Sequence, residues 1–373
     1  MAEPDATPAL GVIKPQQADL FTPSHPLLLA GGGHLDLVSV AFETYGTLNE
    51  ARDNAVFVCH ALTGDAHAAG WWANMIGPGK PIDTEKWYVI CPNLLGGCQG
   101  TTGPSSTNPA TGHIYGLDFP LLHMRDFVTV HRALLDHLGI TRLHAAIGGS
   151  LGGMQVLQWA IDFPDQIAKP IVIAASARLT AQNIAFSAVA REAIMQDENF
   201  LGGRFAEQGR NPDVGLAVAR MMAHITYLSE EAFTAKFGRA PQGDTADPGF
   251  GVDFAVESYL RHQGQAFLAR FDALSYLYLS RVMDYFDPFA EPIASLSAGP
   301  HFLVLSFDSD WRFATSHSLS IVRQLMDAHA DVTFREISSP WGHDSFLLEV
   351  PEYLATVKQF VQAPKLTGGV ANE

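Results

Sequence analysis

Ser150 has the clearest potential for chemistry, because it is the centre of the Gly-x-Ser-x-Gly pattern in residues 148–152. Residues 143–148 form a strand candidate, and residues 151–163 form a helix candidate that stops before Pro164. A serine on a sharp turn from strand to helix needs small neighbours, and the helix N–H groups favour negative charge beside it. The pattern therefore predicts a nucleophilic serine. The alternative is a glycine-rich packing turn with an ordinary serine.

A serine nucleophile needs a base, and the base needs a carboxylate that fixes its tautomer. Residues 301–306 read as a strand that leads to Asp308 and Asp310, and residues 332–337 read as a strand that leads to His343. Both carboxylates are expected on the same side of an extended segment, so position alone leaves the acid open. The chain order of serine, acid and histidine is that of the α/β-hydrolase fold. His343 has the right order, strand and flanking glycine, and its rivals are three other histidines, His60, His224 and His317.

The tetrahedral intermediate of acyl transfer needs two backbone N–H donors. One follows the nucleophile, and the other comes from a loop after an earlier strand. Leu151 is the first candidate, and Leu62 is the second because it follows the strand candidate at residues 54–59. His60 precedes Leu62 in this loop, and we expect it to be structural rather than catalytic.

The distribution of strands and helices predicts an α/β fold with a mostly parallel sheet flanked by helices. A helical pattern replaces the strand pattern in residues 180–292, which predicts a helical cap. The cap is inserted into an α/β-hydrolase core of residues 16–179 and 293–363. Flexible tails are expected at residues 1–15 and 364–373. The expected strands are residues 38–45, 54–62, 87–95, 143–148, 170–175, 301–306 and 332–337. The expected helices are residues 121–138, 151–163, 181–196, 213–228, 230–237, 252–263, 267–285 and 353–361.

The composition describes a globular protein, since 47% of the 373 residues are hydrophobic and only 17% are charged. A net charge of -16 argues against non-specific binding to nucleic acid or anionic membranes, which requires basic patches. The three cysteines form no CxxC pair, and the first twenty residues have no signal-peptide pattern, so we expect a cytoplasmic protein. No metal-ligand cluster or HExxH motif occurs, and we expect neither a metal nor a permanently bound cofactor.

Seven segments between residues 41 and 350 resemble the homoserine O-acyltransferases, a family of the α/β-hydrolase superfamily. They are FETYGTLN, CHALTGDAH, WWANMIGPGKPID, LGGCQGTTGPSSTNPATG, YGLDFP, GGSLGGMQ and GHDSFLLE. The resemblance implies a ping-pong reaction in which the serine takes an acyl group from the co-substrate acyl-CoA and passes it to L-homoserine. It also selects Asp310, because the family's acid directly precedes a W-x-F pattern, and it implies a homodimer formed through the cap.

The helix candidate at residues 213–228 is almost entirely apolar apart from Arg220 and His224, which share one face with Tyr227. A lone arginine is costly to bury unless it meets an anion. In the resembled family the matching arginine binds the homoserine carboxylate, the tyrosine assists, and the acid after the catalytic histidine, here Asp344, holds the amino group. The alternative for Arg220 is a structural salt bridge.

Arg312 bears on the choice of acyl group. The pattern DWRF resembles the succinyl-using branch of the family, as do AQNIAF, HITYLS and VESYLRHQG. A guanidinium could pair with the distal carboxylate of succinyl-CoA, which favours succinyl-CoA over acetyl-CoA. The alternative is a surface arginine that covers the strand end. Other possible functions are an O-acetyltransferase, a serine O-acyltransferase, an esterase with the same triad, and a non-catalytic binding protein.

Overall fold

The computed structural model describes residues 14–242, 250–297 and 299–364. Its centre is an eight-stranded sheet with the order β1-β4-β8-β5-β9-β10-β11-β12. The pairs β1–β4 and β4–β8 are antiparallel, and all other neighbouring strands of this sheet are parallel, which confirms the mostly parallel sheet. The bounds are β1 Gln16–Phe21, β4 Val38–Tyr45, β5 Ala55–Cys59, β8 Tyr88–Pro92, β9 Leu143–Gly149, β10 Ile167–Ile173, β11 His301–Phe307 and β12 Asp331–Ile337.

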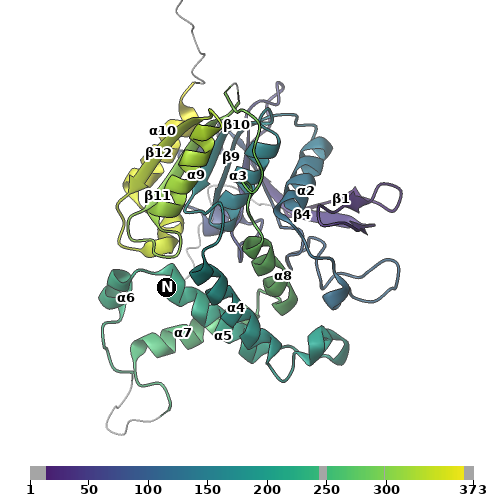
Figure 1. The fold of residues 1–373 in the computed structure, drawn as a ribbon, viewed down its shortest axis with the longest axis vertical. Coiled ribbons are helices and arrows are strands. Elements are labelled where there is room, and N and C mark those ends of the chain that lie inside the picture. The colour runs from purple at the N-terminus through teal and green to yellow at the C-terminus, as the bar shows by residue number, and fades with distance from the viewer. Residues whose placement is uncertain (1–13, 243–249, 298, 365–373) are drawn as a thin grey trace, which may run out of the picture.

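Helices cover both faces of the sheet (Figure 1). Successive side chains of a strand point to opposite faces, and on β5 Phe57 belongs to one apolar core whereas Val56 and Val58 belong to the other. The first core includes residues of α2, α3 and α9, and the second includes residues of α1 and α10. The bounds are α1 Ala68–Trp71, α2 Met124–His137, α3 Leu151–Asp162, α9 Thr315–Asp327 and α10 Pro351–Gln362.

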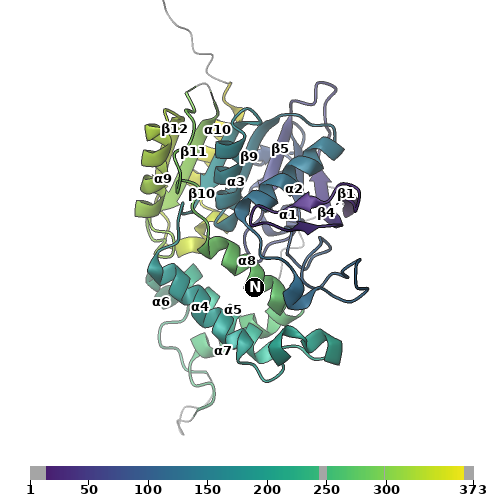
Figure 2. The same cartoon turned by 45° about the vertical axis from the view of Figure 1, so that its right-hand side comes forward.

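Among the described residues, five α-helices between β10 and β11 form a layer beyond the sheet edge where the parallel strands end (Figure 1). Helix α8 lies between the other cap helices and the core in both views (Figure 2). A buried ion pair of 2.6 Å from Arg191 to Asp284 joins α4 to α8. The bounds are α4 Ala181–Met195, α5 Asp213–Tyr227, α6 Glu230–Lys236, α7 Ala255–Leu268 and α8 Ala273–Asp284.

The helix expected at residues 267–285 is wrong at its start. Helix α7 continues to Leu268, and α8 begins only at Ala273, because the Asp272 carboxylate accepts a hydrogen bond from Ser275 N at 2.9 Å and caps the new helix. Strand β1 and the helices α1 and α9 were not among the expected elements. The tails expected at residues 1–15 and 364–373 fall almost entirely outside the described residues. Within the described chain, no helix combines the length and apolar character that a membrane span requires.

Candidate active site

Ser150 lies on a tight turn between β9 and α3. Its φ of 58° and ψ of −125° are strained for a residue with a side chain. The turn is crowded, because a Cβ on Gly152 would lie 2.0 Å from the Cys59 carbonyl oxygen at the end of β5. A Cβ on Gly148 would also clash, at 2.4 Å from the backbone of Gly152. The glycines on both sides of the serine are therefore required by close backbone approach, as the sequence predicted.

Asp310 and His343 form a buried hydrogen-bonded pair. Asp310 Oδ2 lies 2.7 Å from His343 Nδ1, and the two residues are 2% and 3% exposed. The other carboxylate oxygen accepts the backbone N–H groups of Arg312 at 3.0 Å and Phe313 at 2.9 Å. Three donors hold the carboxylate, so it can fix the imidazole with its proton on Nδ1 and leave Nε2 to act as a base.

Asp308 does not take part in this pair. Residues 308–310 form a turn and not the expected extended segment, with Asp310 N donating to Phe307 O at 3.1 Å. The Asp308 carboxylate accepts Ser339 N–H at 2.9 Å and so braces the loop that leads to the histidine. The turn thus gives the two acids different partners.

One aromatic ring brings the His343 loop against the serine turn. The Phe346 ring lies 5.4 Å from the His343 ring, and a Cβ on Gly149 would come within 2.5 Å of the same ring. Trp72 holds this loop by donating Nε1–H to Phe346 O at 2.7 Å. The part of the chain that is described shows no hydrogen bond from Ser150 to His343, and catalytic hydrogen bonds often tighten only in the substrate complex.

The backbone N–H groups of Leu62 and Leu151 donate to no acceptor among the described residues. They lie on two segments that Gln155 joins, since its Nε2 donates to His60 O at 3.0 Å and to Leu151 O at 3.2 Å. Both candidate oxyanion donors are therefore free, and their segments are held together. Of the four histidines considered from the sequence, His343 is the one that contacts Asp310.

Arg220 and Tyr227 extend from α5 toward the same site. The Arg220 guanidinium donates to Thr63 Oγ1 at 3.2 Å and lies 4.6 Å from the centre of the Phe267 ring. It forms no ion pair within residues 14–242, 250–297 and 299–364, so the expected alternative of a structural salt bridge finds no partner there. The Tyr227 ring lies 6.0 Å from the His343 ring.

Asp344 directly follows the histidine and is close enough to Arg220 to interact electrostatically. Burial raises the pKa of its carboxyl, and the charges of His343 and Arg220 oppose this rise. The site thus contains a cation and an acid that are not paired with each other by a salt bridge. Such an arrangement suits a ligand that carries both an anion and a cation.

Arg312 is 9% exposed, so the alternative of a surface arginine is wrong. Its Nη1 donates to Thr226 Oγ1 on α5 at 2.7 Å, and its guanidinium lies 6.0 Å from the centre of the Tyr227 ring. No carboxylate of the described chain forms an ion pair with it. A buried guanidinium that contacts Thr226 and lies near the Tyr227 ring can bind a further anionic group.

Comparison with known proteins places this site in a family. The family model of the alpha/beta hydrolase fold matches residues 54–350. A homoserine O-succinyltransferase of Nocardioides sp. is 56% identical over 95% of this chain and 100% of the relative. A homoserine O-acetyltransferase of Mesorhizobium japonicum is 50% identical over 94% of both chains. This chain belongs to the homoserine O-acyltransferase family of α/β hydrolases.

Solved structures agree with this membership. The crystal structure of homoserine O-acetyltransferase from Bacillus anthracis covers 95% of this homoserine O-acyltransferase-family chain, with a TM-score of 0.85 and 26% identity. The crystal structure of an esterase covers 94% of it, with a TM-score of 0.83 and 28% identity. The recognised family and the α/β-hydrolase fold are therefore confirmed.

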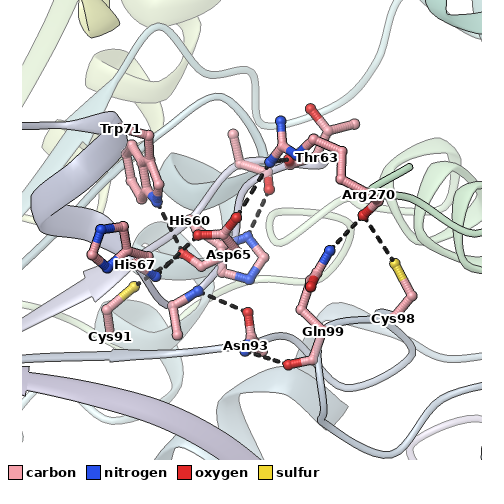
Figure 3. A network of polar contacts seen from close by, with 12 residues as sticks. His60, Thr63, Asp65, His67, Trp71, Cys91, Asn93, Cys98, Gln99 and Arg270 are labelled. Carbon is pink, nitrogen blue, oxygen red and sulfur yellow. Dashed lines mark hydrogen bonds and ion pairs between the residues drawn. The ribbon is translucent and has the colours of Figure 1, made fainter. Parts of the chain in front are cut away.

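Sequence reasoning missed several residues that hold the site of this homoserine O-acyltransferase-family member together. Arg270, just after α7, donates to Thr63 O at 3.0 Å and pairs with Asp65 at 3.3 Å, which ties the cap to the loop after β5 (Figure 3). Gln155 lies in the helix that follows the serine and joins the two oxyanion segments. A glutamine at a buried position of this mostly apolar helix was the signal that could have revealed it. Arg270 had no such signal, because its partners are distant in sequence.

Proposed function

We propose that this chain transfers the acyl group of an acyl-CoA to the hydroxyl of L-homoserine by a ping-pong reaction. The observation that carries the proposal is the buried Asp310–His343 pair beside a serine on a strained turn. His343 Nε2 takes the proton of Ser150 Oγ as this oxygen bonds to the thioester carbonyl carbon. The carbon–sulfur bond then breaks, and the proton passes to the CoA sulfur.

The second half-reaction repeats these events with the acceptor. His343 takes the proton of the homoserine hydroxyl as its oxygen bonds to the acyl carbon. The bond from the acyl carbon to Ser150 Oγ breaks, and Ser150 recovers a proton from His343. The N–H groups of Leu62 and Leu151 stabilise the oxyanion in both halves.

The acceptor is bound by charge in the proposed complex. Arg220 takes the homoserine carboxylate with help from Tyr227, and Asp344 takes the ammonium group. An esterase would not need this pair of opposite charges, which supports a transferase that holds a zwitterion and excludes water. Serine is shorter by one methylene, a difference that is worth only about 1–3 kcal/mol in a pocket.

Succinyl-CoA is the proposed donor. The buried Arg312 guanidinium supplies hydrogen-bond donors of the kind that the distal carboxylate of a succinyl group would need, and Thr226 accepts one of its N–H groups. Relatives named O-succinyltransferase are 48–56% identical, and relatives named O-acetyltransferase are 48–50% identical. An acetyl donor is the alternative, because an acetyl group has no carboxylate to use these donors.

The reaction is tested by intact-mass spectrometry after exposure to each acyl-CoA alone. We expect a succinyl mass gain located on Ser150, and CoA release that needs homoserine for turnover. Turnover without homoserine would indicate a hydrolase. A mass gain on a different residue would overturn the proposed nucleophile.

The donor is tested with Arg312→Leu, using Arg323→Leu on the exposed face of α9 as the control. We expect Arg312→Leu to lower kcat/KM for succinyl-CoA by roughly 10–100-fold, because charge-assisted hydrogen bonds are lost. The value for acetyl-CoA and both values of the control should change little. If Arg312→Leu retains the preference for succinyl-CoA, the donor assignment is wrong.

The proposed enzyme is a cytoplasmic homodimer with no resident cofactor. The dimer would form through the cap, where α4 and α5 expose large apolar side chains that include Val189, Val214, Val218 and Ile225. Exposed apolar surface of this kind favours association. Sedimentation velocity is expected to show a dimer that Val218→Asp converts to a monomer.

A further inference from the structure

The His60 side chain lies directly after β5, is buried, and has both ring nitrogens bound to backbone. Nε2 lies 3.1 Å from Leu94 N, and Nδ1 lies 2.7 Å from Ala61 O. These contacts decide where the proton is, because a backbone N–H can donate only to an unprotonated nitrogen. Nε2 is therefore the acceptor, and Nδ1 carries the proton and donates it to Ala61 O. Burial lowers the pKa of His60, in agreement with a neutral ring.

The bond to Ala61 O controls the direction of the next N–H. The Ala61 carbonyl and the Leu62 N–H belong to one planar trans peptide, so they point in opposite directions. Two donors hold the carbonyl, His60 Nδ1 at 2.7 Å and Gly64 N at 3.0 Å. The Leu62 N–H must then face the other way, and it donates to no acceptor among the described residues.

The preceding carbonyl is held as well. His60 O accepts from Gln155 Nε2 at 3.0 Å, and Gln155 Oε1 lies 2.9 Å from His131 Nε2. An amide oxygen accepts only, so His131 donates and fixes the orientation of the Gln155 amide. Gln155 also donates to Leu151 O. Two successive carbonyls of the loop are thus bound by side chains, and the same glutamine contacts the segment of the second candidate donor.

We propose that His60 is a positioning residue that sets the direction of the Leu62 N–H for the oxyanion hole, as the Nδ1-protonated neutral ring. The inference rests on the proposed function, because it takes Leu62 as an oxyanion donor. His60 touches no reacting atom. It acts through the peptide that it holds, and a rotated peptide would present the Ala61 oxygen to the oxyanion.

Two amide substitutions separate the two contacts of His60. In His60→Asn the amide N–H occupies the place of Nδ1 and can still hold Ala61 O, while the bond to Leu94 is lost. In His60→Gln the amide oxygen occupies the place of Nε2 and can still accept Leu94 N–H, while the bond to Ala61 is lost. Each variant loses one hydrogen bond, so a merely structural role predicts similar effects for both.

We expect the two variants to differ in kcat but not in KM. Loss of an oxyanion donor lowers kcat by about 10²–10³-fold, and misalignment of one that Gly64 still holds should lower it by about tenfold in His60→Gln. His60→Asn should stay within about threefold of the wild type, and KM for acyl-CoA should not change in either. Equal kcat values, or a lower kcat for His60→Asn, would overturn the inference.

A neutron crystal structure of the wild-type protein tests the same inference and does not depend on whether a variant folds. A deuteron on His60 Nδ1 and none on Nε2 is expected at neutral pH, and the reverse arrangement would overturn it. The proposed function is judged separately, by acylation of Ser150 in the wild type. If Ser150 is acylated and the two variants have equal kcat values, the proposed role of His60 is wrong but the proposed reaction is still supported.

Discussion

The core and the cap both contribute polar groups to the site, and these groups differ in how many hydrogen bonds they form. In the core, Asp310 accepts three hydrogen bonds and His60 uses both ring nitrogens. From the cap, Arg220 reaches the site with a single hydrogen bond to Thr63, and His224 Nε2 has no partner among the described residues. Hydrogen bonds hold the polar groups of the core in place, as the proposed reaction requires, whereas the cap leaves binding capacity for a ligand.

The difference has an energetic meaning. A partly buried cation without an anion, such as Arg220, is unfavourable, and an anionic ligand that binds only the folded protein relieves this and stabilises the fold. Arg191 of α4 and Asp284 of α8 pair with each other inside the cap, whereas Arg220 forms no ion pair among the described residues. Stability therefore draws on charges of α4 and α8, and binding draws on a charge of α5.

The largest expected effect is in the core, with Asp310→Asn compared to Asp308→Asn. Asp310→Asn should lower kcat by about 10⁴-fold, because the histidine loses its required tautomer. Asp308→Asn should change kcat by only a few-fold, since an amide oxygen can still accept Ser339 N–H. Steady-state release of CoA measures both. Similar losses in the two variants would show that the acid is not specific to residue 310.

The next largest effect is on the free energy of unfolding, when an ion pair of the cap is compared with an ion pair of the core. Arg191→Met should lower the free energy of unfolding by roughly 3–5 kcal/mol, because the buried Asp284 keeps only the longer 3.4 Å pair with the exposed Arg281. Arg125→Met, which removes an exposed partner of Asp162, should lower it by less than about 1 kcal/mol. Urea unfolding followed by circular dichroism gives both values. Equal losses would mean that the cap is not held by its buried pair.

The smallest effect is a pH dependence of acceptor binding. The pKa of Asp344 is raised by burial, so its carboxyl gains a proton at a higher pH than an exposed carboxyl does. As the pH falls through this raised pKa, the negative charge for the ammonium group is lost, and KM for homoserine should rise several-fold. Asp344→Asn should raise KM at every pH and remove the dependence. A wild-type KM that stays constant into the acid range would contradict the role of Asp344.

Much of the fold could be predicted because the sheet is built from short apolar runs that each need two buried faces. The order of Ser150, Asp310 and His343 could also be predicted, since each follows a strand of a parallel sheet and the ends of such strands share an edge. The catalytic roles of these residues stay predictions, although their placement is compatible with them. The cap helices followed from their apolar periodicity.

The remaining features depend on contacts between distant segments. The choice of Asp310 over Asp308 is made by a turn whose partners, Ser339 and His343, lie about thirty residues later. The burial of Arg312 depends on Thr226 of the cap, and no local pattern reveals that contact. The break between α7 and α8 depends on one capping side chain, Asp272, inside a continuous helical pattern. Sequence spacing cannot decide such features, because the deciding partner is not nearby in the chain.

The cap leaves the sheet after β10 and returns at β11, and these two strands are direct neighbours with Ile171 opposite Leu303. Adjacent strands are only about 4.8 Å apart, so a segment of almost any length can join them without disturbing their register. Mutation can therefore change the cap side of the site while the proposed nucleophile and base are inherited unchanged. A transferase and an esterase can share one scaffold for this reason, and new acceptor specificities can arise by exchange of a single inserted piece.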